Sequence, residues 1–293
     1  HRDLHSFPTR RSSDLLASNR EALRQAVYGS WGALLMARIR HLLNRNSRSG
    51  SRRNILAHYD LGNDFYRLWL DRTMSYSAAI YRDADDGSLE SAQLAKYRRI
   101  LKRLQAQPGQ RILEIGCGWG GFARMAFDDG LALTGLTLSP AQLAWAQNRV
   151  PGADLRLQDY RDLNERFDHV VSIEMFEAVG ERWWPTYFAK VAGALKPGGK
   201  AVVQSITIAD DLFADYRRGT DFIQQYIFPV GLLPSRSEFR AVAARQGLVV
   251  NDEFAFGRDY ARTLAEWRQA FEDNWLAIRK QGFDERFRRL WRF

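Results

Sequence analysis

The stretch Arg111-Ile-Leu-Glu-Ile-Gly-Cys-Gly-Trp-Gly-Gly121 decides the fold prediction, because an apolar run leads directly into a cluster of glycines. The run Arg111–Ile115 predicts a short buried strand, and the glycines predict a tight turn into a helix. Glycines at such a turn let backbone amides approach a ligand at the helix N-terminus, since no side chain blocks the way. Gly116, Gly118 and Gly121 also fit the pattern G-x-G-x-x-G of dinucleotide sites.

Two features of the sequence argue against a dinucleotide. Glu114 stands two residues before the first glycine. A dinucleotide site also places an acidic residue at the end of the second strand, where this sequence reads Gly-Leu-Thr at 135–137. The order Glu-x-Gly-x-Gly instead resembles the class I methyltransferases, which use S-adenosylmethionine. We therefore expect Glu114, Gly116 and Gly118 to bind that cofactor.

Strand-like and helix-like segments alternate after the glycine turn. This alternation predicts a doubly wound, mostly parallel α/β sheet with helices on both faces, as in the class I methyltransferase (Rossmann-like) fold. The expected strands are Arg111–Ile115, Leu131–Leu136, Ala153–Leu157, Asp168–Ile173, Ala201–Ile208 and Leu248–Phe256. The expected helical segments are Asn54–Arg103, with breaks near Gly62 and around Asp83–Ser88, and Pro140–Arg149, Trp183–Leu195, Ser235–Gln246 and Tyr260–Arg292. The long aromatic interruption Ala209–Pro234 predicts a helical lid.

Three regions are expected along the chain. Residues 1–15 have no clear strand or helical period, and we expect them to be a non-native artefact. Residues 16–53 predict an N-terminal helix and a basic linker. Residues 54–293 are the expected S-adenosylmethionine-dependent methyltransferase domain. No strand-like run follows Arg258, so we expect this domain to be C-terminally truncated and to lack the last strand of its fold.

Composition narrows the class of protein. The 293 residues are 45% hydrophobic and 26% charged, which is typical of a globular chain. Cys117 is the single cysteine, so an intramolecular disulfide and a cysteine-rich zinc site are excluded, no metal is expected, and a cytoplasmic location fits. No apolar run is long enough for a transmembrane helix. The formal charge of +9 implies affinity for a polyanion, either nucleic acid or an anionic membrane surface, with a generally basic surface that has no such partner as the alternative.

Further polar residues fall at the expected carboxyl ends of the strands, where a nucleoside ligand would lie. Thr137 and Gln142 are candidates to hydrogen-bond ribose hydroxyls, while Ser139 and Pro140 fit a helix N-cap. Asp159 is a candidate acceptor for an exocyclic amine, with a solvated turn as the alternative interpretation.

Motifs spread from Asn54 to Phe293 resemble, in order, the cyclopropane-fatty-acyl-phospholipid synthases and the related mycolic-acid methyltransferases. The motifs are HYDLGNDFY at 58–66, Tyr76-Ser77, the glycine turn, Thr137-Leu138-Ser139, Gln158-Asp159-Tyr160, Met175-Phe176-Glu177, YIFP at 226–229, Leu233-Pro234-Ser235 and Asp259-Tyr260. The resemblance implies methyl transfer from S-adenosylmethionine to the double bond of an unsaturated acyl chain in a phospholipid. It also implies that Tyr76 and Ser77 hold the methionine end of the cofactor, and that Glu177 and Tyr260 hold a bicarbonate ion that serves as base.

Three positions depart from the family pattern. Ala78 and Gln204 stand where the family usually has cysteine and histidine, and Ala178 stands where it often has histidine. Gln204 can still donate a hydrogen bond but cannot carry charge, so it is kept as a candidate catalytic residue. Whether the product is a cyclopropane, a methylated or a methylene chain is left open.

Methyl transfer would leave a carbocation on the acyl chain, which aromatic faces stabilise without capturing it. Tyr226, Phe228 and Tyr260 are candidates for this role, and an ordinary lid core is the alternative for the first two. His58, Cys117, Trp183 and Trp184 are interpreted as structural residues.

The expected partner is a phospholipid membrane with unsaturated acyl chains, approached from the cytoplasm by a peripheral protein on the inner face. Four arginines are candidate contacts to it: Arg45, Arg48, Arg52 and Arg53. Nucleic acid is not expected, and a homodimer is left open. The alternative functions are a methyltransferase acting on a small metabolite or nucleic acid, and a non-catalytic lipid-binding relative.

Overall fold

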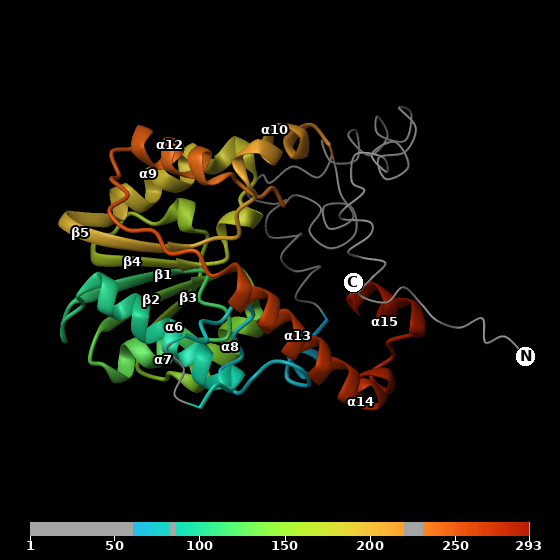
Figure 1. Ribbon diagram of the computed structural model, residues 1–293. Coiled ribbons are helices and arrows are strands. Elements are labelled where there is room, and N and C mark those ends of the chain that lie inside the picture. Colours follow the sequence, from blue (N-terminus) through green and yellow to red (C-terminus); the bar gives the residue numbers. More distant parts are fainter. Residues whose placement is uncertain (1–60, 83–85, 220–230, 293) are drawn as a thin grey trace, which may run out of the picture.

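Five parallel strands form one sheet in the computed structural model, which describes residues 61–82, 86–219 and 231–292 (Figure 1). The strands are β1 (Arg111–Ile115), β2 (Ala132–Thr137), β3 (Asp154–Leu157), β4 (Phe167–Ile173) and β5 (Leu195–Gln204). Their order is β3-β2-β1-β4-β5, and all neighbours are parallel. The strand order reverses between β1 and β4, which is the switch point where such sheets bind ligands. The predicted doubly wound α/β fold is confirmed.

Helices cover both faces of this sheet (Figure 1). One face carries α6 (Leu89–Leu104), α7 (Gly121–Asp128) and α8 (Pro140–Arg149); the other carries α9 (Trp184–Ala194) and α12 (Arg236–Arg245). Cys117 and Phe122 belong to the first core, and Trp184 and Tyr187 to the second, all of them buried. The structural interpretation of Cys117 and Trp184 is confirmed.

Serine side chains begin three of the helices. Ser88, Ser139 and Ser235 each accept a hydrogen bond from the backbone N–H three residues further on, at the starts of α6, α8 and α12. This bond satisfies a helix-end donor that has no partner within the helix. Pro140 occupies the first turn of α8, so the N-cap interpretation of Ser139 is confirmed.

An aromatic cluster joins the segment before the sheet to the last helices. It involves α5 (Asn63–Tyr66), α13 (Gly257–Asp273), α14 (Trp275–Lys280) and α15 (Glu285–Arg292). The Phe65 ring lies 5.2 Å from the Trp291 ring and 4.9 Å from the Phe283 ring, and Trp69 lies 5.7 Å from Trp267. Large aromatic surfaces buried in this way fix α13 beside the sheet (Figure 1).

Short helices follow the carboxyl ends of three of the strands. They are η1 (Tyr160–Asp162) after β3, η2 (Phe176–Ala178) and η3 (Glu181–Trp183) after β4, and α10 (Asp210–Arg218) after β5. The helix α10 falls within the predicted lid, whose residues 220–230 lie outside the described chain. The expected N-terminal helix, the basic linker and His58 also lie outside it.

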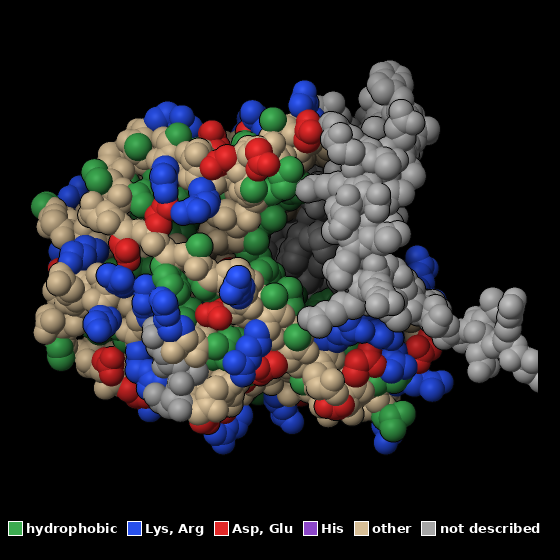
Figure 2. Space-filling view, viewed as in Figure 1, with side chains coloured by type: hydrophobic (Ala, Val, Ile, Leu, Met, Phe, Trp, Pro, Cys, Tyr) green, Lys and Arg blue, Asp and Glu red, His purple; other side chains and the backbone are tan. Residues whose placement is uncertain are grey.

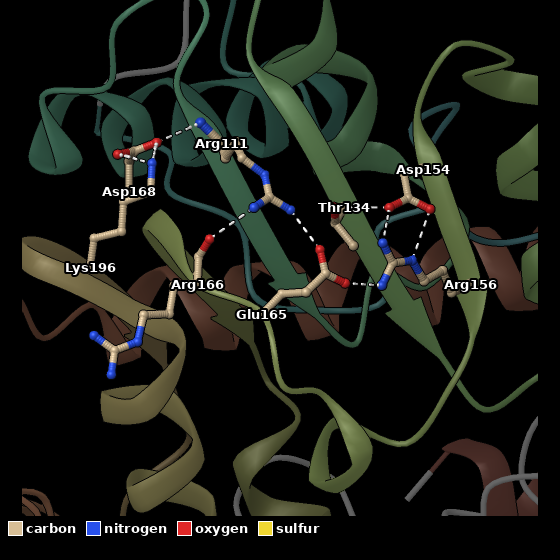
Figure 3. Close-up of polar contacts among 8 residues, drawn as sticks. All are labelled: Arg111, Thr134, Asp154, Arg156, Glu165, Arg166, Asp168 and Lys196. Carbon is tan, nitrogen blue, oxygen red and sulfur yellow. Dashed lines mark hydrogen bonds and ion pairs between the residues drawn. The ribbon is translucent and has the colours of Figure 1, made fainter.

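Ion pairs tie the strands together at the opposite, amino-terminal edge of the sheet (Figure 3). Arg111 at the start of β1 pairs with Glu165 at 2.7 Å, and Glu165 also pairs with Arg156 of β3. Asp168 of β4 accepts from the Arg111 backbone N–H at 2.8 Å and pairs with Lys196 of β5 at 2.8 Å. These charged groups pair with one another within the network. We therefore assign this edge of the sheet to stability and not to ligand binding.

Three sequence predictions of local structure are wrong. Leu248–Phe256 forms no strand; Val249 is 81% exposed, and the sheet described here has no neighbouring strand for this segment to pair with. The strand β5 covers Leu195–Gln204 and not Ala201–Ile208, because the Ile206 N–H leaves the ladder and donates to Glu177.

The third error concerns the segment between Asn54 and Arg103. Residues 67–88, apart from 83–85, are turns and extended chain between α5 and α6. The turns between residues 67 and 74 are closed by local backbone hydrogen bonds, whereas the N–H groups from Ala78 to Tyr81 donate to partners outside the segment. The Ala79 N–H donates to Thr263 Oγ1 at 3.1 Å, and the Tyr81 N–H donates to Asp259 Oδ2 at 3.2 Å. Tertiary contacts with α13 therefore override helical propensity here.

Candidate active site

The glycine turn lies at the carboxyl end of β1, where the strand order reverses. Gly116 and Gly118 have φ angles of 84° and 53°, which favour glycine. A Cβ at Gly116 would lie 3.1 Å from Met175 Cγ, whereas a Cβ at Gly118 would meet no atom within 4 Å. Gly118 therefore borders open space, as expected of a turn that admits a ligand.

Glu114 is buried directly beneath this turn, with 3% of its surface exposed. Its Oε2 atom has no hydrogen-bond partner among the described residues. Burial raises the pKa of Glu114 to about 8, and the nearby Lys96 charge acts in the opposite direction. A buried acceptor without a partner calls for a donor from a ligand.

The predicted ribose contacts lie together at the end of β2. Thr137 Oγ1 donates to Gln142 Oε1 at 3.0 Å and accepts from the Ser139 N–H at 3.2 Å. Asp159 lies at the end of β3, where Oδ1 accepts from the Arg161 backbone and Nε at 3.0 and 2.9 Å. The Asp159 side chain is 10% exposed, so the interpretation as a solvated turn is wrong.

Asn63 ties the segment before the sheet to the glycine turn. Trp119 Nε1 donates to Asn63 Oδ1 at 2.7 Å, and Asn63 Nδ2 donates to the Ala141 carbonyl at 3.1 Å. One amide thus links the turn after β1 with the first turn of α8. The motif that contains Asn63 was identified in the sequence, but this role was not.

Tyr76 and Ser77 are placed beside the glycine turn by different contacts. Tyr76 packs between aromatic rings, 5.4 Å from Trp69 and 5.3 Å from Trp267. The Ser77 hydroxyl accepts a hydrogen bond from Lys96 Nζ at 2.6 Å. Lys96 is completely buried, which lowers its pKa to about 8. Sequence reasoning missed Lys96, although a lysine on the apolar face of a helix was a visible signal.

Glu174 stands at the centre of a second polar group, and sequence reasoning also missed it. Its Oε1 accepts from the Ala78 N–H at 2.9 Å and from Gln204 Nε2 at 2.7 Å. The Glu174 N–H donates to the Gln204 carbonyl at 2.9 Å. Two of the three positions that depart from the family pattern, Ala78 and Gln204, thus bind Glu174.

Glu177 and Tyr260 complete this group. Glu177 Oε1 accepts from the Ile206 N–H, and its buried Oε2 has no partner among the described residues. Burial and the charge of Glu174 raise the pKa of Glu177 to about 7. Burial, followed by the charges of Glu174 and Glu177, also raises the pKa of Tyr260. The structure therefore brings together Glu177, Gln204 and Tyr260, whereas Tyr226 and Phe228 lie outside the described residues.

Comparison with known proteins identifies the family. The family model described as mycolic acid cyclopropane synthetase matches residues 46–293. The chain belongs to the mycolic acid cyclopropane synthetase family. Within this family it is 44% identical over 240 residues to the cyclopropane-fatty-acyl-phospholipid synthase of Escherichia coli K12, covering 80% of this chain and 60% of that protein.

A second relative of this chain is the tuberculostearic acid methyltransferase UfaA1 of Mycobacterium tuberculosis. It is 39% identical over 259 residues, covering 84% of this chain and 61% of that protein. The chain thus spans about 60% of the length of these two relatives.

Solved structures of the family share the fold. The cyclopropane synthase MmaA2 from Mycobacterium tuberculosis matches with a TM-score of 0.71 and 32% identity, over 78% of this chain and 85% of that one. The mycolic acid cyclopropane synthase CmaA1, complexed with SAH and CTAB, matches with a TM-score of 0.74 and 31% identity, over 81% of this chain and 89% of that one.

In the described residues no helix is both long and apolar enough to span a membrane.

Proposed function

We propose that the chain transfers a methyl or methylene group from S-adenosylmethionine to the double bond of an unsaturated phospholipid acyl chain. One observation carries the proposal: the open glycine turn and the carboxylate group around Glu174 and Glu177 adjoin at the ends of β1 and β4. The turn suits a nucleoside-linked methyl donor, and the carboxylates suit a reaction that passes through a cation. The family relatives named for cyclopropane synthesis and fatty acid methylation support it.

The residues around the turn fit S-adenosylmethionine. Gly118 leaves space for the ligand, and the unpaired Oε2 of Glu114 could accept from its ammonium group. Thr137 and Gln142 lie at the end of β2, and Asp159 at the end of β3, where the ribose and the adenine would lie. We assign Tyr76 and Ser77 to the methionine end, with Lys96 fixing the Ser77 hydroxyl.

The bound cofactor would supply an electrophilic methyl group to an alkene, which is a poor nucleophile and must be held in line with it. The protein's part is then to stabilise the positive charge that develops on the acyl chain. The ionised carboxylate of Glu177 does this by its charge and Tyr260 by its ring face. Hydrophobic side chains gather near the carboxyl ends of β4 and β5 (Figure 2), which suits an alkyl substrate.

We further propose a peripheral site of action on the cytoplasmic face of the inner membrane. The formal charge of +9 supports attraction to anionic lipid headgroups. The acyl chain would then reach the site from a bilayer and not from solution.

The test uses the whole chain with radiolabelled S-adenosylmethionine and vesicles of phosphatidylglycerol and phosphatidylethanolamine with monounsaturated chains. We expect label in the extracted acyl chains, and none when the vesicles contain only saturated chains. Label in a soluble product would instead support a small-metabolite methyltransferase. Cofactor binding without any transfer would support a non-catalytic lipid-binding relative. Gas chromatography coupled to mass spectrometry, before and after catalytic hydrogenation of the chains, separates cyclopropane, methyl and methylene products.

A further inference from the structure

Glu174 has a backbone conformation that its side chain does not favour. Its φ angle is 48°, and only Met74 and Gln105 share a positive φ among the described residues that are not glycine. A glycine would adopt this conformation without strain. Strain that persists at a ligand-binding edge of a sheet is a reason to look for a function of the side chain. Here the strained residue places a carboxyl group directly beyond β4.

Burial raises the pKa of Glu174, and its polar contacts act against burial in favour of the ionised form. Two N–H groups, from Ala78 and from Gln204, converge on Oε1 at 2.9 and 2.7 Å. Lys96, which is completely buried, adds an opposing positive charge that favours the ionised form. Among the described residues none donates a hydrogen bond to Oε2. One carboxylate oxygen is thus anchored, and the other has no protein donor.

A separate bicarbonate ion does not fit the residues present. The N–H groups of Ala78 and Gln204 are engaged by Glu174, so they are not available to a second anion. An added anion would also lie beside two carboxylates, those of Glu174 and Glu177, whose mutual repulsion is already present. Gln204 carries no positive charge to offset this repulsion.

We propose that the carboxylate of Glu174 is the proton acceptor of the reaction, in place of a bound anion. This inference rests on the proposed function. The alkene π pair forms the new carbon–methyl bond while the sulfur–methyl pair stays on sulfur, and the neighbouring carbon becomes a cation. Glu174 Oε2 then takes a proton from a carbon next to the cation or from the added methyl. The released C–H pair closes a double bond or a cyclopropane ring, and Glu174 becomes a neutral carboxylic acid.

Glu177 is the less suitable acceptor of the two carboxyl groups. One backbone N–H, that of Ile206, binds it, and the charge of Glu174 opposes its ionisation. Burial raises the pKa of Glu174 as well, but two N–H donors and the Lys96 charge favour its ionised form. Two neighbouring carboxyl groups in such different surroundings take different roles.

The test compares wild type, Glu174→Gln and Glu174→Gly in the vesicle assay, in buffer freed of carbon dioxide and in buffer with added bicarbonate. Gln105→Gly is the matched control, because it removes a positive-φ side chain far from the site, at the end of α6. Calorimetry with S-adenosylmethionine and a thermal melt establish that each variant is folded and binds cofactor.

We expect wild-type turnover to be the same in both buffers. Glu174→Gln should lose about a hundredfold in both, the usual scale for losing acid–base assistance, with cofactor affinity within a few-fold. Glu174→Gly should be equally slow without bicarbonate and should recover at least about tenfold with it, because the vacated N–H groups can then bind the anion. Gln105→Gly should match wild type.

Wild-type turnover that disappears without bicarbonate and returns with it would overturn the inference, as would near-wild-type turnover of Glu174→Gln. A wild-type protein that labels no lipid would instead refute the proposed function. In that case, binding of ¹³C-bicarbonate measured by NMR tests the role of Glu174 independently. Binding by Glu174→Gly but not by wild type supports the assignment of Glu174 as the resident anion, and equal binding by both overturns it.

Discussion

At the residue scale, the raised pKa of Glu177 predicts how turnover depends on pH. Its pKa of about 7 arises from burial and from the charge of Glu174. The ionised form stabilises the cation, so we expect turnover to rise as pH increases through about 7 and to level off above it. Glu177→Gln should lower turnover at pH 8 by about a hundredfold and remove this rise. Initial rates between pH 6 and 9 measure both effects.

Cofactor affinity of the Glu177→Gln variant should stay within a few-fold of wild type, because Glu177 lies beyond β4 and not at the glycine turn. A rise through pH 7 that persists in the variant would assign it to another group. Glu174, whose pKa burial also raises, and Glu114, with a pKa of about 8, are the titratable groups to which the rise would then be assigned.

Gly118 offers a direct test of the cofactor position. Gly118→Asp would place a side chain and a negative charge in the open space beside the turn. We expect S-adenosylmethionine affinity, measured by calorimetry, to fall at least about a hundredfold. Gly109→Asp is the matched control, because Gly109 also has a positive φ and open space but precedes β1, at the opposite edge of the sheet. Equal losses in both variants would mean that backbone strain, and not the ligand, is responsible.

At the element scale, α13 holds the segment that carries Tyr76 and Ser77. Thr263, completely buried in α13, accepts from the Ala79 N–H at 3.1 Å and donates to the Asp259 carbonyl at 2.8 Å. Thr263→Val keeps the shape but leaves that N–H unpaired. We expect a loss of about 1–3 kcal/mol in the free energy of unfolding in urea.

The same Thr263→Val substitution should lower turnover, because Tyr260 lies one turn away on α13. Leu264→Ala on the exposed side of this helix is the control, since Leu264 is 46% exposed. If the two variants are equally stable, the bond between α13 and Ala79 does not contribute to the fold.

At the scale of the whole molecule, the basic charge predicts how the chain meets its substrate. We expect sedimentation with vesicles to increase with the fraction of phosphatidylglycerol and to fall as salt rises from about 0.05 to 0.5 M, because salt screens charge over about 10 Å or less. Arg45, Arg48, Arg52 and Arg53 are the candidates to replace with glutamine in this assay; they lie outside the described residues. Binding that depends on neither lipid charge nor salt would contradict the prediction and indicate attachment by insertion of apolar side chains.

Local sequence patterns were enough to predict the part of the sheet around the cofactor turn. Arg111–Ile115 is a strand with the predicted bounds, and the helix Pro140–Arg149 begins at its serine cap. Local signals suffice there, because a buried apolar run, a glycine turn and a helix cap each act within a few residues. The motif that ends in Glu177 likewise marked the carboxyl end of β4.

The grouping of residues in the site depends on contacts between distant parts of the chain. Glu174 joins the site through its contacts with Ala78 and Gln204, which lie 30 or more positions away in the sequence. Lys96 joins it through Ser77, 19 positions away. The backbone at Ala79 and Tyr81 is extended and not helical because Thr263 and Asp259 accept from its N–H groups. Hydrogen-bond partners distant in sequence have no periodic signature, whereas strands and helix caps do. The fold could therefore be predicted from local sequence patterns, whereas the arrangement of charges in the site could not.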